Sequence, residues 1–313
     1  MDCGVNLYTD NFKETPHSAT VARDYHNNTF GLFVQNTWAA SRLLNIESGL
    51  RGDYTSPYGF ALLPRVSALI NFSPRFTSRI GGGMGYKVPT IFNEESEQLH
   101  YKNILPLDKE NTRYERSTGA NLDFTYKTSF DDLKLMINPL FFYTRINHPL
   151  VLDSVALNQQ FVNSEGYVDS KGIDLSVRLS IDKIKFFTGY SYTVVKNHFN
   201  GTNEIYPLSP RHRLHFDLVY ELEGKLRVAF ESYYTSQQQL SDGATGRSYW
   251  LIGALVEKSW KKFSLFVNGE DLNDARQTKW EPIYTGTMDM PVFRDIYAPL
   301  DGITINGGIK IKL

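Results

Sequence analysis

A glycine-rich segment, Gly81 to Lys87 (GGGMGYK), carries the residue type that phosphate-binding loops use. Such a loop needs a fixed glycine spacing and must open a helix whose N-terminus faces the phosphate. The spacing here fits neither of the common phosphate-binding motifs, and Val88-Pro89 disfavours a helix because the residue before a proline avoids helical geometry. We therefore expect these small residues to let a neighbouring side chain, or the plug of a barrel, approach the barrel wall closely.

Histidines and carboxylates that could bind a metal ion occur at two places. His212 and His215 are three residues apart, and an odd separation on a strand places two side chains on opposite faces, so a shared ion is not expected. Three glutamates between residues 94 and 97 precede His100, in either a cation site or a solvated loop. No Ser/His/Asp or Cys/His arrangement has a supporting local context. The sequence predicts no cofactor, no metal site and no catalytic site, and hence no enzyme.

Composition limits the class of protein. No stretch approaches the run of about 18 uncharged apolar residues that a transmembrane helix requires, and the mean hydropathy is −0.34. The 33 basic and 34 acidic residues leave a net charge of −1, without the basic stripe of a nucleic-acid-binding protein. A lone Cys3 excludes an intramolecular disulfide. The 19 Tyr and 20 Phe favour a β-rich chain, because flat rings pack well on a pleated surface.

Alternation of apolar and polar residues predicts the strands that must position these groups. From Ile303 to Leu313 the two kinds alternate without a miss, and the same period of two recurs in residues 120–126, 173–179 and 214–220. We count about 14 such segments in the sequence, with boundaries uncertain by a few residues. Their expected starts lie near residues 3, 29, 43, 61, 75, 115, 133, 167, 184, 211, 225, 248, 262 and 302.

The predicted connections alternate between short turns and polar stretches that are long in all but one case. The short set covers residues 40–42, 73–75, 130–132, 182–183, 223–225 and 261–262. The other set covers residues 10–28, 54–59, 87–113, 146–166, 197–210, 237–247 and 272–301. A transmembrane β-barrel has this asymmetry, with short periplasmic turns and long extracellular loops. So many long structureless loops would be unusual in a compact soluble domain.

Aromatic residues are placed as in the two interfacial belts of a membrane barrel. Trp250 and Trp260 share one face of a predicted strand and lie ten residues apart. On a strand tilted about 45°, ten residues rise roughly 23 Å, close to the apolar band of about 25 Å that aromatic belts flank. Trp38, Tyr190 and Tyr192 are expected to join these belts. The alternative is that these rings are core aromatics of a β-sandwich.

Polar residues of the opposite parity are expected to face the barrel interior. There they would contact a plug or line a water-filled path. They are Arg51, Asp53, Arg79, Asn121, Asp123, Asp174, Arg178, His215 and Asp217.

Several motifs follow one another along the chain: Gly49 to Asp53 (GLRGD), Gly85 to Thr90 (GYKVPT), Ser209 to His212 (SPRH) and Val267 to Asp274 (VNGEDLND). In this order they resemble the "GLRYD" strand, the "GFKAPT" element, the "P-x-H" strand start and the "NLFD" stretch of TonB-dependent receptor barrels. The resemblance covers the whole chain. It implies an all-β fold, a transmembrane antiparallel β-barrel, of which this chain would form about 14 carboxy-terminal strands of a 22-strand type. It also implies a location in the bacterial outer membrane.

The chain departs from the family pattern in two ways. Leu313 stands where a terminal Phe is common, and no export signal, coupling box, plug domain or set of first strands is present in this sequence. Residues 1–313 are therefore expected to be the carboxy-terminal portion of the barrel, without a plug domain. An open sheet would leave about ten unpaired backbone groups on each edge, at several kcal/mol apiece in hydrocarbon. Either an upstream segment completes the barrel, or the strands close on themselves, or the chain never inserts.

The resemblance implies a receptor, here a fragment, that takes up a scarce nutrient such as a ferric siderophore or a cobalamin-like complex. Its expected partners are outer-membrane lipid, the missing plug and N-terminal strands, a small-molecule metal complex and, through the plug, the inner-membrane TonB energy-coupling complex. No nucleic acid is expected. Two alternatives stay open, a passive porin-like barrel and a soluble β-rich binding domain or enzyme. The candidate ligand-contacting residues in the long loops are Tyr86, Tyr101, Trp280, Tyr284 and Arg294.

Overall fold

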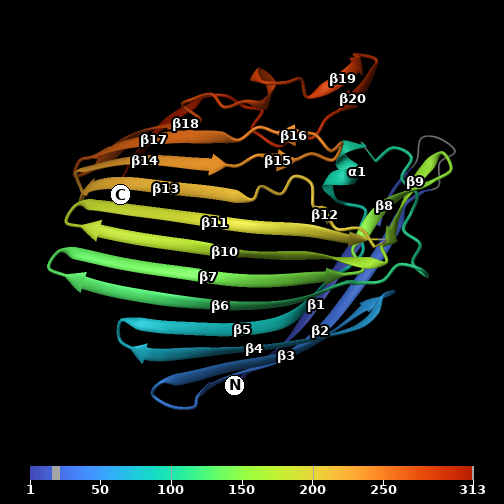
Figure 1. Cartoon of the computed structure of the whole chain (residues 1–313), viewed down its shortest axis with the longest axis horizontal. Coiled ribbons are helices and arrows are strands. Elements are labelled where there is room, and N and C mark those ends of the chain that lie inside the picture. Colours follow the sequence, from blue (N-terminus) through green and yellow to red (C-terminus); the bar gives the residue numbers. More distant parts are fainter. Residues whose placement is uncertain (16–21, 100, 200, 312–313) are drawn as a thin grey trace.

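Fourteen long strands form one antiparallel sheet in which each strand pairs with the next along the chain (Figure 1). The computed structural model describes residues 1–15, 22–99, 101–199 and 201–311, so His100 and Leu313 lie outside the described residues. The strands of this sheet are β1 (Asp2–Lys13), β2 (Asp24–Ala39), β3 (Leu44–Ser56), β4 (Gly59–Ser73), β5 (Phe76–Lys87), β6 (Glu115–Phe130), β7 (Leu133–Asn147), β10 (Gly166–Ile181), β11 (Ile184–Phe199), β13 (His212–Leu222), β14 (Leu226–Thr235), β17 (Tyr249–Ser259), β18 (Phe263–Glu270) and β21 (Thr304–Ile311).

The all-β fold and the strand positions predicted from alternation are confirmed. The strands predicted to start near residues 115, 133 and 184 start at Glu115, Leu133 and Ile184. The expected loop over residues 10–28 is wrong at both ends, because β1 runs to Lys13 and β2 begins at Asp24. The physical reason is that Phe12 pairs with Tyr25 and both side chains pack into a cluster of loop residues. The burial of Phe12 and Tyr25 stabilises the β1–β2 hairpin beyond the residues that alternate between apolar and polar.

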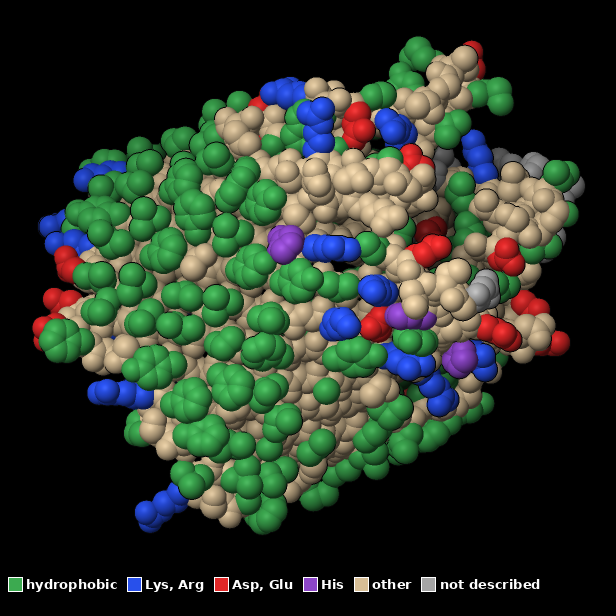
Figure 2. Space-filling view, viewed as in Figure 1, with side chains coloured by type: hydrophobic (Ala, Val, Ile, Leu, Met, Phe, Trp, Pro, Cys, Tyr) green, Lys and Arg blue, Asp and Glu red, His purple; other side chains and the backbone are tan. Residues whose placement is uncertain are grey.

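The sheet has an apolar outer face and a polar inner face. On β13 the outer face carries Leu214, Phe216 and Leu218, whereas His215 and Asp217 lie on the inner face. Figure 2 shows apolar side chains covering most of the left and centre of the outer face. This two-sided pattern is opposite to that of a water-soluble barrel, which buries its apolar face inside.

The five predicted belt aromatics all lie exposed on the protein surface, each with more than a third of its side chain accessible. Trp250 contacts Tyr234 on the neighbouring strand, and Trp260 stacks on Phe263 at a short turn. Their position relative to a membrane stays a prediction. These residues are Trp38, Tyr190, Tyr192, Trp250 and Trp260.

The short turns and the other connections alternate as predicted, and they lie at opposite ends of the sheet in Figure 1. The connections of the second set are not structureless, however, because local hydrogen bonds and packing order most of them. Their described residues contain one α-helix, one 3-10 helix and seven short strands. These are α1 (Glu94–Gln98), β8 (Leu150–Val155), β9 (Asn158–Asn163), β12 (Glu204–Ile205), β15 (Gln238–Gln239), β16 (Thr245–Gly246), η1 (Gln277–Lys279), β19 (Tyr284–Thr287) and β20 (Met290–Phe293).

The sheet has two edges. Within the described residues, β1 pairs with β2 alone and β21 pairs with β18 alone, so the first and last strands do not close on each other. No described helix is long and apolar enough to cross a membrane.

The glycine-rich segment lies inside β5 and opens no helix. A Cβ atom at Gly85 would lie 2.7 Å from Ser117 Oγ, and one at Gly82 would lie 3.0 Å from Gly119 O. A neighbouring side chain, that of Ser117 on β6, therefore does approach this segment closely, whereas the approach of a plug stays a prediction.

Candidate ligand-binding face

The connection between β5 and β6, residues 88–114, packs against β2 and β9. Its backbone pairs with β9, since Leu105 N donates to Gln159 O and Gln159 N donates to Asn103 O, both at 2.8 Å. Asn93 begins α1 by accepting a hydrogen bond from Ser96 N at 3.0 Å, a common helix cap. Buried apolar residues from this connection, β2 and β9 form what we call the first loop cluster: Tyr25, Ile91, Ile104, Leu107 and Phe161.

Tyr101, a predicted ligand-contacting residue, packs against the first loop cluster and is held by Arg23. Arg23 Nη1 donates to Tyr101 O at 3.1 Å, and the guanidinium lies 5.8 Å from the centre of the Tyr101 ring. Arg23 Nε also donates to Glu14 Oε2 at 2.8 Å, and this hydrogen bond lowers the pKa of Glu14. Tyr101 thus ties the β1–β2 end to the long connection, and its contact with a ligand stays a prediction.

Tyr86, the second candidate, is hydrogen-bonded to β3. Its hydroxyl donates to Asp53 Oδ2 at 2.8 Å, while Arg51 Nε lies 2.8 Å from Asp53 Oδ1. Asp53 is only 1% exposed, and the Tyr86 ring contacts Tyr114 at 4.8 Å between centroids. The pKa of Tyr114 is raised because its phenol is buried. The Tyr86 hydroxyl therefore already has an acceptor, and a contact of Tyr86 with a ligand stays a prediction.

The connection between β18 and β21, residues 271–303, forms a second packed unit. Gln277, which is 1% exposed, accepts hydrogen bonds from Tyr297 N (2.9 Å) and Ala298 N (3.2 Å) through Oε1. Its Nε2 donates to Asp295 O at 2.8 Å. One side chain therefore satisfies three backbone groups of the returning segment. We call the apolar residues around it the second loop cluster: Leu208, Leu240, Tyr249, Trp280, Tyr297 and Ala298.

The three remaining candidates all lie in this connection, in different surroundings. Trp280 belongs to the second loop cluster, with its ring 6.2 Å from that of Tyr249. Arg294 Nη1 lies 3.6 Å from Glu281 Oε2, so its charge is partly neutralised. Tyr284 lies on the projecting β19–β20 hairpin and is 42% exposed. Of the three, only Trp280 belongs to the second loop cluster, and the ligand contacts of all three stay a prediction.

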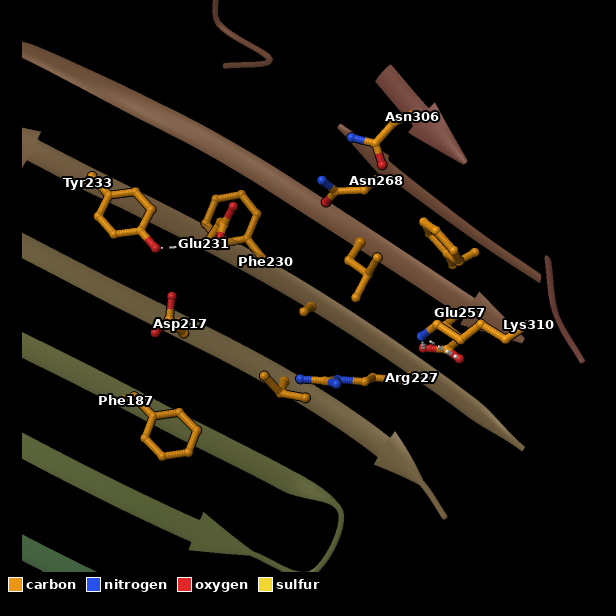
Figure 3. Close-up of a pocket in the computed structure, with 14 residues that line it drawn as sticks. Phe187, Asp217, Arg227, Phe230, Glu231, Tyr233, Glu257, Asn268, Asn306 and Lys310 are labelled. Carbon is orange, nitrogen blue, oxygen red and sulfur yellow. Dashed lines mark hydrogen bonds and ion pairs between the residues drawn. The ribbon is translucent and has the colours of Figure 1, made fainter. Parts of the chain in front are cut away.

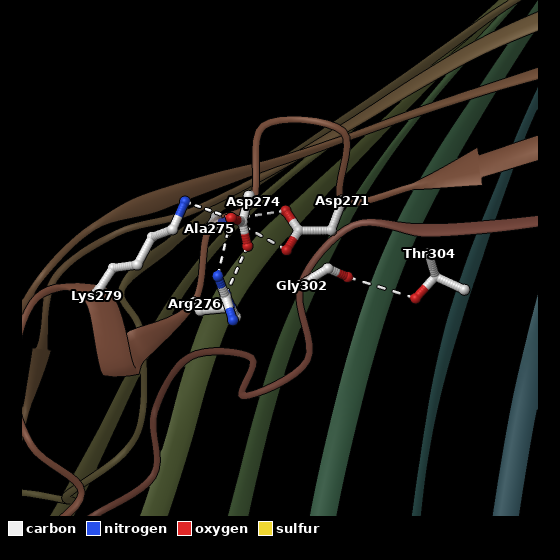
Figure 4. A network of polar contacts seen from close by, with 7 residues as sticks. All are labelled: Asp271, Asp274, Ala275, Arg276, Lys279, Gly302 and Thr304. Carbon is white, nitrogen blue, oxygen red and sulfur yellow. Dashed lines mark hydrogen bonds and ion pairs between the residues drawn. The ribbon is translucent and has the colours of Figure 1, made fainter.

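An ionic network fixes the start of the same connection (Figure 4). Asp274 pairs with Lys279 and, through Oδ1, with Arg276 Nε at 2.6 Å. These two cations lower the pKa of Asp274, with Lys279 the larger cause. Asp271 Oδ1 accepts a hydrogen bond from Ala275 N at 2.9 Å. The connection therefore leaves β18 in a defined direction.

The stretch that resembles "NLFD" continues the sheet hydrogen bonding past the end of β18. Leu272 N donates to Ile252 O at 2.8 Å, and Asn273 Oδ1 accepts from Ile252 N at 3.0 Å. Asn273 Nδ2 donates to Trp250 O at 2.8 Å. The Asn273 side chain thus bonds the backbone of β17 as a strand would.

Two adjoining pockets lie on the inner face beside the second loop cluster, and Arg213 lines both. One has a volume of about 390 Å³ and includes Asp174 and Ser191. The other has a volume of about 340 Å³ and includes Gln238 and Tyr297. Arg213 is exposed and forms no ion pair with any described residue. A cation in a walled, polar pocket beside the long connections suits an anionic ligand.

Sequence reasoning overlooked Arg213, although the signal was present. Arg213 has the same parity as His215 and Asp217, which were both assigned to the barrel interior. His212 and His215 do lie on opposite faces, as predicted, since His212 contacts Tyr190 and His215 stacks on Tyr233.

Farther along the inner face, polar and apolar side chains are mixed (Figure 3). A pocket of about 570 Å³ there is lined by acidic and basic side chains, and Glu257 pairs with Lys310 at 3.2 Å. A larger one of about 960 Å³, across β2 to β7, contains the Arg79–Asp123 pair at 3.2 Å. Among the side chains that the structure describes, no group of three or more His, Cys, Asp or Glu residues could hold a metal ion.

Comparison with known proteins gives one family. The sequence model described as "TonB dependent receptor-like, beta-barrel" matches residues 4–272. An uncharacterized TonB-dependent receptor from Haemophilus influenzae is 24% identical over 274 residues, covering 80% of this chain and 78% of that protein.

Solved structures share the fold. The ferric enterobactin receptor PfeA of Pseudomonas aeruginosa is 14% identical, with a TM-score of 0.67 over 92% of this chain and 45% of its own. The siderophore receptor PirA of Acinetobacter baumannii is 15% identical, with a TM-score of 0.67 over 92% of this chain and 46% of its own. The iron transporter FrpB of Neisseria meningitidis is 12% identical, with a TM-score of 0.69 over 93% of this chain and 46% of its own. The chain thus spans about half the length of these solved receptors.

Proposed function

The chain belongs to the TonB-dependent receptor family, and from this we propose that it forms part of an outer-membrane receptor that imports an anionic metal chelate such as a ferric siderophore. The family is one of outer-membrane transport receptors, not of enzymes. The structural neighbours named above, two of them siderophore receptors, support the choice of ligand class.

We place residues 1–313 in the carboxy-terminal part of the barrel, with the plug and the remaining strands supplied from outside this sequence. The two unpaired sheet edges support this arrangement, because unpaired backbone groups in hydrocarbon cost several kcal/mol each. So does the coverage of about 45% of a solved receptor. In this arrangement the TonB energy-coupling complex acts through the plug, and outer-membrane lipid covers the apolar outer face.

The observation that carries the ligand proposal is the position of Arg213. Its guanidinium lies on the polar inner face, lines two adjoining pockets and is unpaired among the described residues. Leu208, Tyr249 and Tyr297 of the second loop cluster line one or both of these pockets with it. A planar guanidinium with free donors suits the oxygens of an anionic chelate, and nearby aromatic rings suit its flat organic part.

The test compares two inner-face arginines in the complete receptor. Arg213→Gln removes the charge beside the loops, whereas Arg178→Gln removes one on the inner face of β10 near a short turn. We expect the first variant to weaken binding of an iron-55-labelled anionic siderophore to whole cells about tenfold, the loss that follows when one charge-assisted contact is removed. The second variant should bind normally.

Equal binding by both variants and the wild type would contradict the role of Arg213. A steady ion conductance in planar bilayers, with no binding or energy-dependent uptake of the chelate, would contradict the receptor function and indicate a passive pore. Recovery of the native protein without detergent, in the soluble fraction, would contradict both.

A further inference from the structure

A pocket on the inner face, close to the short turns, is lined by cations and by none of the described acidic side chains. It has a volume of about 380 Å³ and lies across the β4–β5 turn, β6, β7 and β10, whose short-turn ends are at the left in Figure 1. We call it the cation pocket. Its charged residues are Arg75, Lys127, Lys134 and Arg178.

Strand register places the cation pocket on the same face as Asp217, which lies on the inner wall. Asp217 pairs with Phe187, and Phe187 pairs with Arg178. Arg178 in turn pairs with Met136, and Met136 pairs with Lys127. Because paired residues of an antiparallel sheet point to the same side, these five residues form one row across the inner wall from β13 to β6.

Lys134 and Arg75 complete the group. Lys134 lies two residues from Met136 on β7, one row closer to the short turns. Lys127 N donates to Arg75 O at 2.8 Å, so these two cations are direct neighbours on adjacent segments. Like charges at facing positions destabilise a sheet. An anion bound between them offsets this repulsion.

The wall neutralises other cations nearby but not these four. Arg79 pairs with Asp123 at 3.2 Å, and Lys185 pairs with Glu221 at 2.6 Å. In the described part of the chain, no carboxylate forms an ion pair with a cation of the pocket. Asp217, in the row described above, lies two strands away, or about 10 Å by strand spacing. The cation pocket therefore keeps its positive charge and its donors.

Hydroxyl groups add neutral donors to the pocket. Ser129 and Ser180 pair with Lys134 from opposite sides, and both line the pocket. Ammonium, guanidinium and hydroxyl groups together can donate to several oxygens of one anion. Met136, which also lines the pocket, supplies an apolar surface. This combination suits an anion that carries an organic part.

The cation pocket and Arg213 lie on the same wall. Arg213 pairs with Ser191, and Ser191 pairs with Asp174, which precedes Arg178 by four residues on β10. Strand geometry therefore separates Arg213 from Arg178 by about 13 Å along the strands and about 10 Å across them, or about 16 Å in all. An anion that leaves Arg213 toward the short turns thus meets a second group of cations on the wall.

We propose that the cation pocket is a second binding site for the imported anionic chelate, which holds the chelate on the wall after it leaves Arg213 and before its release at the short-turn side. The proposal rests on the proposed function, from which it takes the ligand and the direction of import. A transport path needs sites that bind strongly enough to accept the ligand and weakly enough to release it. The four cations are exposed, and exposed charges bind weakly.

The test measures surface binding and energy-dependent import of an iron-55-labelled anionic siderophore by cells that carry the complete receptor. We expect Lys127→Gln/Lys134→Gln to bind at the cell surface as the wild type does. Its import should be at least about tenfold slower, the factor that one charge-assisted contact contributes. Lys127→Arg/Lys134→Arg, which keeps both charges, should import at nearly the wild-type rate. Lys261→Gln/Lys262→Gln, at another short turn, should match the wild type.

Arg178→Gln should behave in the same way, with normal surface binding because it lies far from Arg213, and with slower import. Unchanged import in Lys127→Gln/Lys134→Gln would overturn the second site, and so would equal slowing in the variant that keeps both charges. A raised ion conductance of the glutamine variant in planar bilayers would assign these cations to holding the plug instead. A wild-type receptor that neither binds nor imports the siderophore would overturn the proposed function itself.

A direct test places the photoreactive residue benzoylphenylalanine at position 129, in place of Ser129. Illumination during import should attach a carbon-14-labelled siderophore to this position, and cells without a proton gradient should stay unlabelled. The same residue in place of Tyr126 is the matched control, because Tyr126 is 42% exposed on the opposite face of β6. No labelling at position 129, or equal labelling at both positions, would overturn the proposal.

Discussion

Tyr86 Oη donates a hydrogen bond of 2.8 Å to Asp53 Oδ2, although the two residues are 33 positions apart in the chain. Arg51 approaches the same carboxylate from β3, two residues away. The contact joins the last residues of β5 to β3 across β4, at the point where β4 and β5 cease to pair. The buried Asp53 carboxylate thus holds β3 and β5 together where the connection 88–114 leaves the sheet.

We predict that Tyr86→Phe lowers the free energy of unfolding by about 1.5 kcal/mol, since a hydrogen bond to a charged group contributes about this much or more. The measurement is the urea midpoint of the complete receptor in micelles. Tyr54→Phe is the matched control on β3, because the Tyr54 side chain is exposed on the outer face. A shift of the same size in both variants would remove the special role of the Asp53 contact.

Gly31 should not tolerate a side chain. A Cβ there would lie 2.2 Å from Asp53 Oδ1, so Gly31→Ala must displace the buried carboxylate. We expect a loss of about 1 to 3 kcal/mol, typical of overpacking. Gly49→Ala should cost far less, because its Cβ would meet Val34 O at an ordinary 3.6 Å. Similar unfolding midpoints for the two variants would show that the wall relaxes easily around Asp53.

Gln277 should control the order of the connection 271–303. Gln277→Leu keeps a similar volume but leaves the buried N–H groups of Tyr297 and Ala298 without their acceptor. Each such loss costs about 1 to 3 kcal/mol, so limited proteolysis of this connection should become at least about tenfold faster. Gln239→Leu, which alters an exposed side chain, should leave the rate unchanged. Unaltered cleavage in Gln277→Leu would show that apolar packing alone orders the connection.

The Asp274 network should open in acid. Its ion pairs lower the pKa of Asp274 below the ordinary 3.8, so the stabilisation is present above that value and is lost as pH falls through the lowered pKa. The fluorescence of Trp280, with the other three tryptophans replaced by phenylalanine, should therefore change at a pH below 3.8. In Asp274→Asn this transition should vanish and the signal should resemble the acid form throughout. Asp301→Asn, in the same connection, should keep the wild-type transition.

The sequence alone determined the wall of this protein. The period-two pattern in stretches such as residues 303–313 and 214–220 predicted strands and their two faces, because each side chain of a strand must face either lipid or interior. The alternation of short and long connections then predicted an antiparallel barrel wall, since each strand pairs with its neighbour in sequence. These are local properties, so they can be predicted without knowing which distant residues are in contact. The motif order from Gly49 to Asp274 predicted the family for the same reason.

Only the tertiary structure decided how the connections fold and which residues meet at the candidate site. Arg23 holds Tyr101 across 78 positions of the chain, and Gln277 binds Tyr297 twenty positions away. No periodicity constrains such contacts, because an irregular segment can direct a side chain anywhere that packing and hydrogen bonding allow. Arg213 shows the same division: its parity fixed the face on which it lies, but only the folded connections around Tyr297 placed it beside a pocket.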